Sequence, residues 1–439
     1  MLKYKMIADE LKAKIQEGVL KPGQKLPSIK SYAGKMGVNA DTIMKAYQSL
    51  ESEHLIYSVP RSGYYVVKSF IANKTNKHVI DLVTVSLPDS INPYKDFYHC
   101  MEQSIQIHKN LLLEYGQVQG MVELRQALVK HLMTFQIYTN KNDIFITNGA
   151  QQAIYILCVM SFLNQKKKVL VEQPTYSLML EILKQNHIPV IGIKREKTGI
   201  DIKRLEEIFQ AEEIKFFYLM PRFQNPTGYS YTREQKQKIL SLAQKYDVYL
   251  VEDDYLGDLV ENERGDSLYS MAEKGRVIYI RSFSKTFLPG LRLGMVILPE
   301  VLKEEFIKCK RGMDLNTPVL TQGALEIYLR SKMYRLHSAK TREYYEDKMN
   351  VVKKTCACLW PKDKKVYIPD SGIYILFEIE PRRLKALLCN LSRNKILVSE
   401  IKGCFIDEKE ASMHGIRLCV CNNNDQEIIR AMQIISRLC

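Results

Sequence analysis

The stretch Val277-Ile278-Tyr279-Ile280-Arg281-Ser282-Phe283-Ser284-Lys285 decides how most of this chain is interpreted, together with Gly290-Leu291-Arg292-Leu293-Gly294 just after it. Its apolar start predicts a buried strand, and its polar end places a lysine directly beyond that strand. Arg292 follows Lys285 after seven residues. Because ligands of open α/β sheets bind at the carboxyl ends of the strands, the stretch predicts a ligand site.

Similar apolar runs recur along residues 80–439 and alternate with helical patterns such as the one over 233–245. The predicted buried strands cover 169–171, 216–220, 248–251 and 277–280. Such alternation forces a central, mainly parallel sheet that is covered on both faces. We therefore predict an α/β domain over residues 80–439.

Polar motifs follow these strands. The sequence Asn148-Gly149-Ala150-Gln151-Gln152 precedes an apolar helix, so the free N–H groups of Ala150 and Gln151 would hold a phosphate. Tyr176 follows a strand and is placed to stack on a flat ring. Asn225, in Asn225-Pro226-Thr227-Gly228, can donate a hydrogen bond to a phenolate oxygen.

The remaining two motifs complete the chemistry of a pyridoxal phosphate (PLP) site. Asp253, at the end of a strand, can keep a pyridine nitrogen protonated, which makes the ring an electron sink. Tyr255 can donate to the same phenolate as Asn225. Lys285 would form the Schiff base, with its amine activated by desolvation and by cationic neighbours. Each motif alone also fits a loop, a turn or a core residue, so their order carries the interpretation.

That order and spacing resemble the fold type I aminotransferases over residues 80–439. The resemblance implies PLP on Lys285 and a smaller C-terminal α+β subdomain over 310–439. It also implies a homodimer in which Tyr115 reaches the active site of the neighbouring subunit. The residues that it places on the phosphate are Ala150, Gln151, Ser282, Ser284 and Arg292.

Arg417, in Gly415-Ile416-Arg417-Leu418, matches the arginine that binds the substrate carboxylate in these enzymes through two parallel hydrogen bonds. The alternative is a strand arginine in a structural ion pair. If Arg417 points into the site, the ligand is an amine that carries a carboxylate, most simply an amino acid.

The first seventy residues predict a separate domain. Ile7, Leu11 and Ile15 form the apolar stripe of a helix over 4–16. A second helix begins at Ser28 and runs to Met36, and a third begins after Asn39 as its N-cap. The segments 56–59 and 64–67 then predict a two-stranded hairpin with a basic tip. This order of elements predicts a winged helix.

The third helix of such a domain would enter the major groove of DNA, where its first side chains read base edges. Lys30, Lys45 and Arg61 would bind phosphates or the minor groove. The full predicted contact set is Ser28, Lys30, Asn39, Asp41, Thr42, Lys45, Arg61, Ser62 and Gly63.

The pattern Gly18-x-x-Lys21-Pro22-Gly23-x-x-Leu26-Pro27-Ser28, with Gly37-Val38-Asn39 after it, resembles the GntR family over residues 1–67. The resemblance implies that the partner is a double-stranded DNA operator. The alternative is a small helical docking domain with a solvated basic face.

Composition is compatible with both halves. The net charge is +15, of which the first seventy residues contribute +5, so the basic bias is spread along the chain.

No long apolar run and no apolar N-terminal signal are present, and we expect a cytoplasmic protein with a polar linker over 68–79. The ten cysteines lack zinc spacing, so we expect no metal and structural thiols, with Cys419 and Cys421 alternating along a strand.

A GntR-like winged helix joined to an aminotransferase-like domain resembles the MocR subfamily of bacterial transcriptional regulators. The resemblance implies a homodimeric regulator that senses an amino acid or a related amine through an external aldimine with PLP. Two alternatives stay open from the sequence. One is an active aminotransferase with an accessory DNA-binding domain, and the other is an operator-binding dimer whose large domain is only a scaffold.

Overall fold

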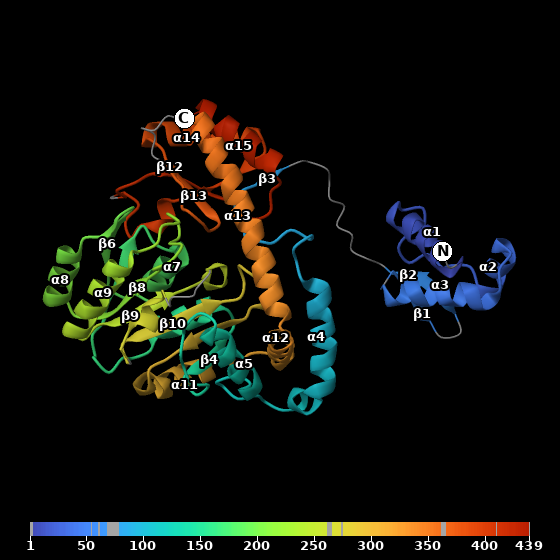
Figure 1. The fold of residues 1–439 in the computed structure, drawn as a ribbon, viewed down its shortest axis with the longest axis horizontal. Coiled ribbons are helices and arrows are strands. Elements are labelled where there is room, and N and C mark those ends of the chain that lie inside the picture. Colours follow the sequence, from blue (N-terminus) through green and yellow to red (C-terminus); the bar gives the residue numbers. More distant parts are fainter. Residues whose placement is uncertain are drawn as a thin grey trace. The chain divides into compact units, whose positions relative to one another are not determined.

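The computed structural model describes residues 3–53, 55–59, 62–67, 79–260, 266–273, 275–360, 366–409 and 411–438. The chain forms two compact units, Met1–His78 and Val79–Cys439, each with its own core (Figure 1). Of the predicted linker over 68–79, only Val79 lies within the described residues. In the part of the chain that is described, no helix is both long enough and apolar enough to span a membrane.

The N-terminal unit is a winged helix. Its elements are α1 Lys3–Gln16, α2 Ile29–Met36, α3 Ala40–Ser52, β1 Ile56–Val59 and β2 Gly63–Val66. The third helix buries Ile43, Ala46, Tyr47 and Leu50 completely, because residues at this spacing share one helical face. Tyr47 also donates from Oη to the carbonyl oxygen of Pro27 at 2.9 Å, which anchors α3 to the turn before α2.

The two caps of the helix–turn–helix differ. Ser28 caps α2, since its hydroxyl accepts a hydrogen bond from the backbone N–H of Ser31 at 3.2 Å. Gly37 ends that helix with φ +62°, a left-handed conformation that favours glycine. Asn39 occupies the N-cap position of α3, but its side chain makes no capping hydrogen bond, in contrast to the prediction.

The large unit is built on an eight-stranded sheet with the order β4-β11-β10-β9-β8-β5-β6-β7. Strands β10, β9, β8, β5 and β6 pair in parallel, whereas β11 is antiparallel to both β10 and β4, and β7 is antiparallel to β6. The bounds are β4 Ile144–Thr147, β5 Lys168–Gln173, β6 Val190–Glu196, β7 Gly199–Ile200, β8 Ile214–Leu219, β9 Tyr249–Asp253, β10 Val277–Ser282 and β11 Gly294–Ile297.

Helices cover both faces of this sheet, as the continuous apolar strands require. In β5, Val169 and Val171 join one core with α6 and α7, whereas Leu170 joins another with α8 and α9. The helices and helical turns of this part of the large unit are α4 Tyr94–Ile107, η1 Lys109–Leu113, α5 Val122–Met133, α6 Ala150–Val159, α7 Ser177–Gln185, α8 Ile202–Ala211, α9 Arg233–Lys245, η2 Gly257–Leu259, α10 Leu268–Met271, η3 Pro289–Leu291, α11 Glu300–Asp314 and α12 Val319–Arg330.

A smaller α+β subdomain follows. Its antiparallel sheet has the order β12-β13-β16-β15, and β14 pairs in parallel with β3, at the start of the large unit. The bounds are β3 Ile80–Asp81, α13 Met333–Leu359, β12 Val366–Tyr367, β13 Tyr374–Glu378, α14 Pro381–Arg393, β14 Ile396–Leu397, β15 Ser399–Glu400, η4 Lys402–Cys404, β16 Gly415–Cys419 and α15 Asp425–Leu438.

The long helix α13 runs through both parts of the large unit (Figure 1). Near its start, Tyr334 packs in the core beneath β10 and β11, and further along, Met349 and Val352 pack in the core of the small subdomain. The predicted fold class is confirmed: a winged helix, a mainly parallel α/β domain and a C-terminal α+β subdomain.

Candidate cofactor site

Lys285 lies three residues beyond the carboxyl end of β10, which ends at Ser282. The neighbouring strand β9 ends at Asp253, which is in register with Ile280. The ends of the two strands are therefore almost level, and their side chains share one edge of the sheet. Burial lowers the pKa of Lys285, so more of its amine is neutral and nucleophilic than for an exposed lysine.

The two carboxyl oxygens of Asp253 differ, because one is hydrogen-bonded and the other has no partner among the described residues. Its Oδ2 accepts a hydrogen bond from Tyr218 Oη at 2.6 Å, whereas Oδ1 is buried and has no hydrogen-bond partner among the described residues. Burial raises the pKa of this carboxyl from 3.8 to about 6. Because an unpaired buried carboxylate oxygen is costly, the position fits a cationic N–H donor such as a pyridinium.

The start of α6 forms a second part of the site. The first N–H groups of a helix have no partner inside it and attract anions. Gly149 precedes Ala150 with φ +75°, and a Cβ atom there would lie 2.8 Å from Arg292 Nη2. A Cβ at Gly294 would lie 2.6 Å from the backbone nitrogen of Ala150. Both glycines therefore leave room for Arg292 and the helix start to approach one phosphate.

Ser282 and Ser284 border the same space. Both side chains are largely buried, and Ser282 Oγ accepts a hydrogen bond from the backbone N–H of Ser284 at 3.2 Å. This bond fixes the turn between β10 and Lys285. Two hydroxyls near a guanidinium and a helix N-terminus are suited to hold phosphate oxygens.

A partly buried network holds the first turn of α6, and no sequence motif indicated it. Asp314 Oδ2 accepts hydrogen bonds from Asn148 Nδ2 at 2.7 Å and from Gln152 Nε2 at 2.9 Å. Lys310, whose side chain is fully buried, pairs with the same carboxylate at 2.8 Å. The loop before the helix is thus fixed before any anion binds.

Arg417 and Asn225 meet at the other end of the site. Arg417 Nη1 donates to Asn225 Oδ1 at 2.6 Å, and Nη2 donates to Ser399 Oγ at 3.3 Å. The guanidinium also lies over the ring of Tyr374 at 4.3 Å. Within the described ranges, no carboxylate pairs with Arg417, so the structural ion pair considered as an alternative is not found there.

Tyr176 lies among these charged groups. It precedes α7 and is half-buried, and burial raises its pKa to about 12. Asp253, Arg292 and Arg417 all act on its hydroxyl electrostatically, and Arg292 and Arg417 act in the same way on Lys285. Five residues from four separate segments of the chain therefore lie close together.

One predicted cofactor contact, Tyr255, is placed differently. Tyr255 Oη donates to the carbonyl oxygen of Phe223 at 2.5 Å, so its proton is not directed at a phenolate as predicted. The physical reason is burial, because a buried phenol needs a partner within the chain. Tyr115, which was predicted to reach the site of the neighbouring subunit, is 89% exposed.

The predicted DNA contacts lie mostly on the surface of the winged helix. Lys30, Asp41 and Lys45 are exposed, Asn39 is exposed beside them, and Thr42 is half-buried. Three further members of the predicted set are described. The Ser28 side chain caps α2, and on the wing Ser62 Oγ contacts Tyr65 Oη at 2.6 Å and Gly63 begins β2. Arg61 lies outside the described residues.

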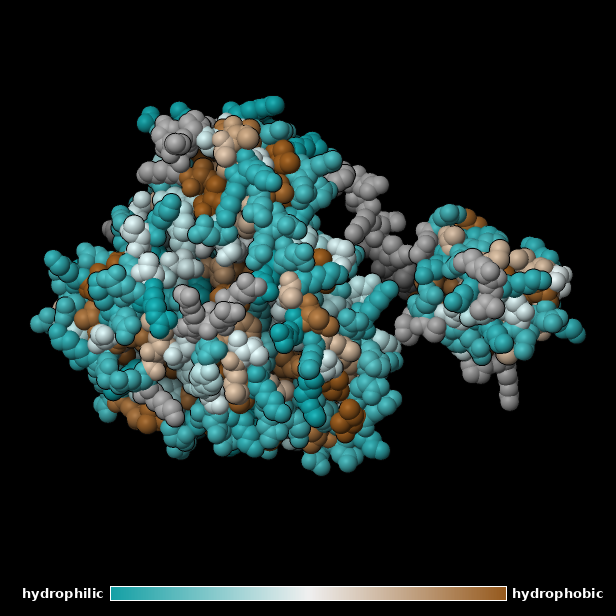
Figure 2. Space-filling model, in the orientation of Figure 1, coloured by the Kyte–Doolittle hydropathy of each residue, from teal (hydrophilic) through white to brown (hydrophobic). Residues whose placement is uncertain are grey.

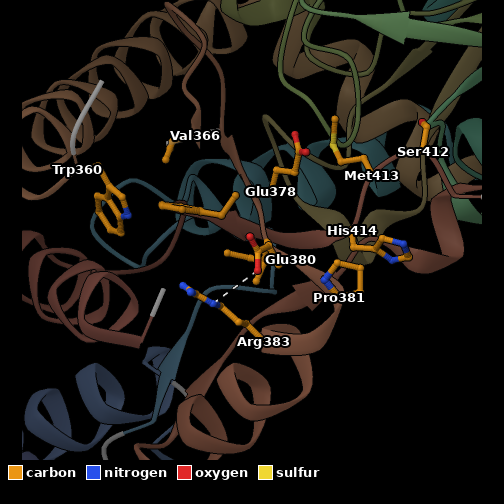
Figure 3. Close-up of a pocket in the computed structure, with 11 residues that line it drawn as sticks. Trp360, Val366, Glu378, Glu380, Pro381, Arg383, Ser412, Met413 and His414 are labelled. Atoms are coloured by element: carbon orange, nitrogen blue, oxygen red, sulfur yellow. Dashed lines mark ion pairs between the residues drawn. The ribbon is translucent and has the colours of Figure 1, made fainter. Parts of the chain in front are cut away.

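A separate cavity of about 450 Å³ lies in the small subdomain, where Trp360, Glu378 and His414 contribute to its wall (Figure 3). None of the predicted cofactor residues lines it. The cavity is therefore distinct from the space around Lys285.

Comparison with known proteins agrees with this geometry. Residues 85–435 match the family described as aminotransferase class I and II, and residues 3–66 match the bacterial regulatory proteins of the gntR family. The chain is 45% identical over 349 residues to the HTH-type transcriptional regulator YcxD of Bacillus subtilis (strain 168), with 79% of each chain covered. It is 28% identical over 431 residues to the HTH-type transcriptional regulator YjiR of Escherichia coli (strain K12), with 91% of each covered.

Solved structures show a similar fold for the large unit. A kynurenine aminotransferase from Pyrococcus horikoshii superposes with a TM-score of 0.75 at 24% identity, over 83% of this chain and 91% of that chain. A winged helix of the gntR type joined to an aminotransferase-like domain defines a class of DNA-binding transcriptional regulators. The chain belongs to the aminotransferase class I and II family and, with its gntR-family N-terminal domain, to the MocR subfamily.

Proposed function

We propose that this DNA-binding regulator carries PLP on Lys285 and responds to an amine that bears a carboxylate, most simply an amino acid. The observation that carries the proposal is Asp253, whose buried Oδ1 has no partner among the described residues while its Oδ2 is fixed by Tyr218. When bound, PLP would supply an aldehyde that condenses reversibly with amines and a ring that withdraws electrons.

The residues of this chain would hold the cofactor by three separate parts. Asp253 would accept the proton on the ring nitrogen, and the start of α6 with Arg292 would bind the phosphate. Asn225 would direct its amide N–H toward the ring oxygen, because its Oδ1 is already held by Arg417. Lys285 would provide the amine, which burial keeps partly neutral.

Arg417 would select the effector. Its guanidinium is ordered by Asn225, Ser399 and the ring of Tyr374 and has no carboxylate partner among the described residues. A carboxylate of the ligand can therefore take up the two-pronged hydrogen bond that this side chain offers. The ligand acts on DNA binding only through its different affinities for two arrangements of the protein.

A homodimer is part of the proposal. Tyr115 is exposed, and so are Ile107, Leu112 and Leu113, which lie on α4 and η1. Figure 2 shows hydrophobic residues on the surface near the lower end of α4. Apolar side chains gathered in this way favour an interface, and Tyr115 would there reach the cofactor site of the neighbouring subunit.

The test is an absorbance titration of the full-length protein loaded with PLP. A panel of amino acids and of amines without a carboxylate would be added to the wild type and to Arg417→Gln. We expect the lysine-adduct band to shift with one amino acid, and the variant to bind it roughly 10- to 100-fold more weakly. Arg204→Gln, which removes an exposed arginine paired with Glu207, is the matched control and should behave as wild type.

The outcomes separate the candidate functions. A shift that persists supports the sensor, whereas conversion that a keto acid reverses would support an active aminotransferase. The second candidate is kept because Lys285, with its pKa lowered by burial, can also move a proton. An unchanged affinity in Arg417→Gln would contradict the assignment of the carboxylate site.

A further inference from the structure

Cys419 and Cys421 form a thiol pair whose sulfur atoms are only 3.1 Å apart. Both side chains are fully buried. The prediction placed them in alternation along one strand, but β16 ends at Cys419 and Cys421 lies in the turn beyond it. Because a disulfide joins sulfurs at about 2.05 Å, the pair could close with a movement of roughly 1 Å.

The pair lies beside the cofactor lysine. Tyr345, on α13, donates from Oη to the carbonyl oxygen of Lys285 at 3.2 Å and also contacts the thiol of Cys421. Tyr344, the preceding residue, donates to the carbonyl oxygen of Cys421 at 2.9 Å. One helix therefore holds both the lysine segment and the thiol pair.

The surroundings lower the pKa of one of the two thiols, which raises its thiolate fraction. Burial acts to raise the pKa of Cys419, but the contact with Cys421 and the nearby cations Arg417 and Lys285 bring it below its usual value. Burial raises the pKa of Cys421. A thiolate next to a protonated thiol is the arrangement in which one sulfur attacks and the other resolves.

We propose that Cys419 and Cys421 are a reversible thiol–disulfide site, which a small hydroperoxide oxidises next to Lys285. A small oxidant is required because both thiols are fully buried, whereas a bulky disulfide could not reach them. The inference goes beyond amine sensing and does not depend on PLP being bound.

The reaction balances with the hydroperoxide as the only oxidant. The Cys419 thiolate attacks the outer oxygen, the O–O bond breaks, and the departing alkoxide or hydroxide takes up a proton. The sulfenic acid formed is then attacked by Cys421, which gives the disulfide and releases water. Two thiols lose two electrons in total, and the peroxide gains them.

The disulfide would act on the ligand site. Cys419 is two residues from Arg417 on β16. Tyr345 contacts both the thiol of Cys421 and the backbone of Lys285, so it connects the thiol pair to the lysine segment. Closing the pair would pull the end of β16 and remove the thiolate beside Lys285. A disulfide across one intervening residue is strained, and strained disulfides are readily reduced, so the change would be reversible.

The experiment uses the full-length protein, reduced and then treated with hydrogen peroxide, in parallel with and without PLP. Remaining thiols are alkylated and the protein is digested with trypsin. Cleavage after Arg417 and Arg430 leaves both cysteines in the peptide 418–430. We expect that peptide to lose both alkylation sites together, because an internal disulfide forms. Dithiothreitol should reduce this disulfide and restore both thiols. The exposed Cys358 and Cys389 serve as internal references that should react more slowly.

Variants make the result decisive. Cys421→Ser should leave no internal disulfide and let Cys419 stop as a sulfenic acid, which dimedone would label. Cys389→Ser should change nothing in the 418–430 peptide. If Cys358 and Cys389 oxidise while the 418–430 peptide keeps two free thiols, the proposal is wrong. Because this readout is a mass, failure of PLP binding leaves it unaffected and is seen separately as a missing absorbance band.

Discussion

The proposed cofactor end of the large unit and the proposed DNA-binding surface of the winged helix are organised in opposite ways. Near Lys285, the buried Asp253 is held through Oδ2 by Tyr218, and the partly buried Arg417 is held by Asn225. On the winged helix, Lys30 and Lys45 stand exposed on the surface. If the proposed sites are right, the first region is ordered before its ligand binds, whereas the second orders its side chains only on contact with DNA.

This difference predicts how each region responds to substitution. Buried, preorganised groups act in a low dielectric, where the loss of one partner leaves another unsatisfied. Exposed lysines act through phosphate contacts and counterion release, and each contributes a small share. Single changes should therefore be severe at the cofactor site and graded on the winged helix.

The largest expected effect is that of Lys285→Ala. Without the amine no covalent link to PLP can form, so borohydride treatment should fix no cofactor to the protein. Intact-mass measurement would show the added cofactor in the wild type and none in the variant. Lys238→Ala, which removes an exposed lysine paired with Glu234 at 2.7 Å, should retain the full adduct. A cofactor mass on the Lys285 variant would remove this residue from its assigned role.

Asp253→Asn should have two opposite effects. Binding of PLP should weaken, because a hydrogen bond to a charged partner contributes about 1.5–3 kcal/mol, which equals roughly a 10- to 100-fold rise in Kd. Fluorescence titration of the apoprotein with PLP measures this change. An unaltered Kd would mean that the unpaired oxygen of Asp253 does not receive the ring nitrogen.

The same substitution should stabilise the apoprotein at neutral pH. Burial raises the pKa of Asp253 from 3.8 to about 6, so the folded state holds this proton more tightly than the unfolded chain does. The stability that protonated Asp253 contributes is complete below pH 4. The free energy of unfolding then falls by about 3 kcal/mol as the pH rises through 6. Urea unfolding of the variant should show a smaller loss between pH 4 and pH 8. A wild-type curve that is flat over this range would contradict the burial of a charged Asp253.

Much of the fold and of the site could be predicted because local signals agreed. The helix over 233–245 was predicted with the bounds that α9 has, and Thr232 caps it through a hydrogen bond to the backbone N–H of Gln235. Asp253 and Lys285 fell at strand ends because each apolar run stops where its polar motif begins. Motifs at the ends of neighbouring parallel strands meet for geometric reasons alone.

The partners of these residues could not be predicted in the same way. Arg417 and Asn225 are 192 residues apart, and their contact depends on how the small subdomain closes on the sheet. Tyr218 lies within an apolar run, and only the register of β8 and β9 shows that its hydroxyl serves Asp253. Tyr255 was predicted to donate to the ligand. Its buried hydroxyl instead donates to the carbonyl oxygen of Phe223, a partner that the sequence alone does not reveal.

The smallest expected effect is that of Lys45→Ala, on the exposed face of α3. If Lys45 neutralises one phosphate, its removal should weaken binding severalfold and lower the slope of log K against log salt by about 1. The measurement is fluorescence anisotropy at several salt concentrations, on a duplex selected by the wild-type protein from random sequences. Lys14→Ala, which removes a lysine paired with Glu10 on α1, is the control and should keep the slope. An equal slope in the Lys45 variant would place the DNA on another face, whereas a collapse of binding would mean that this surface is as preorganised as the cofactor site.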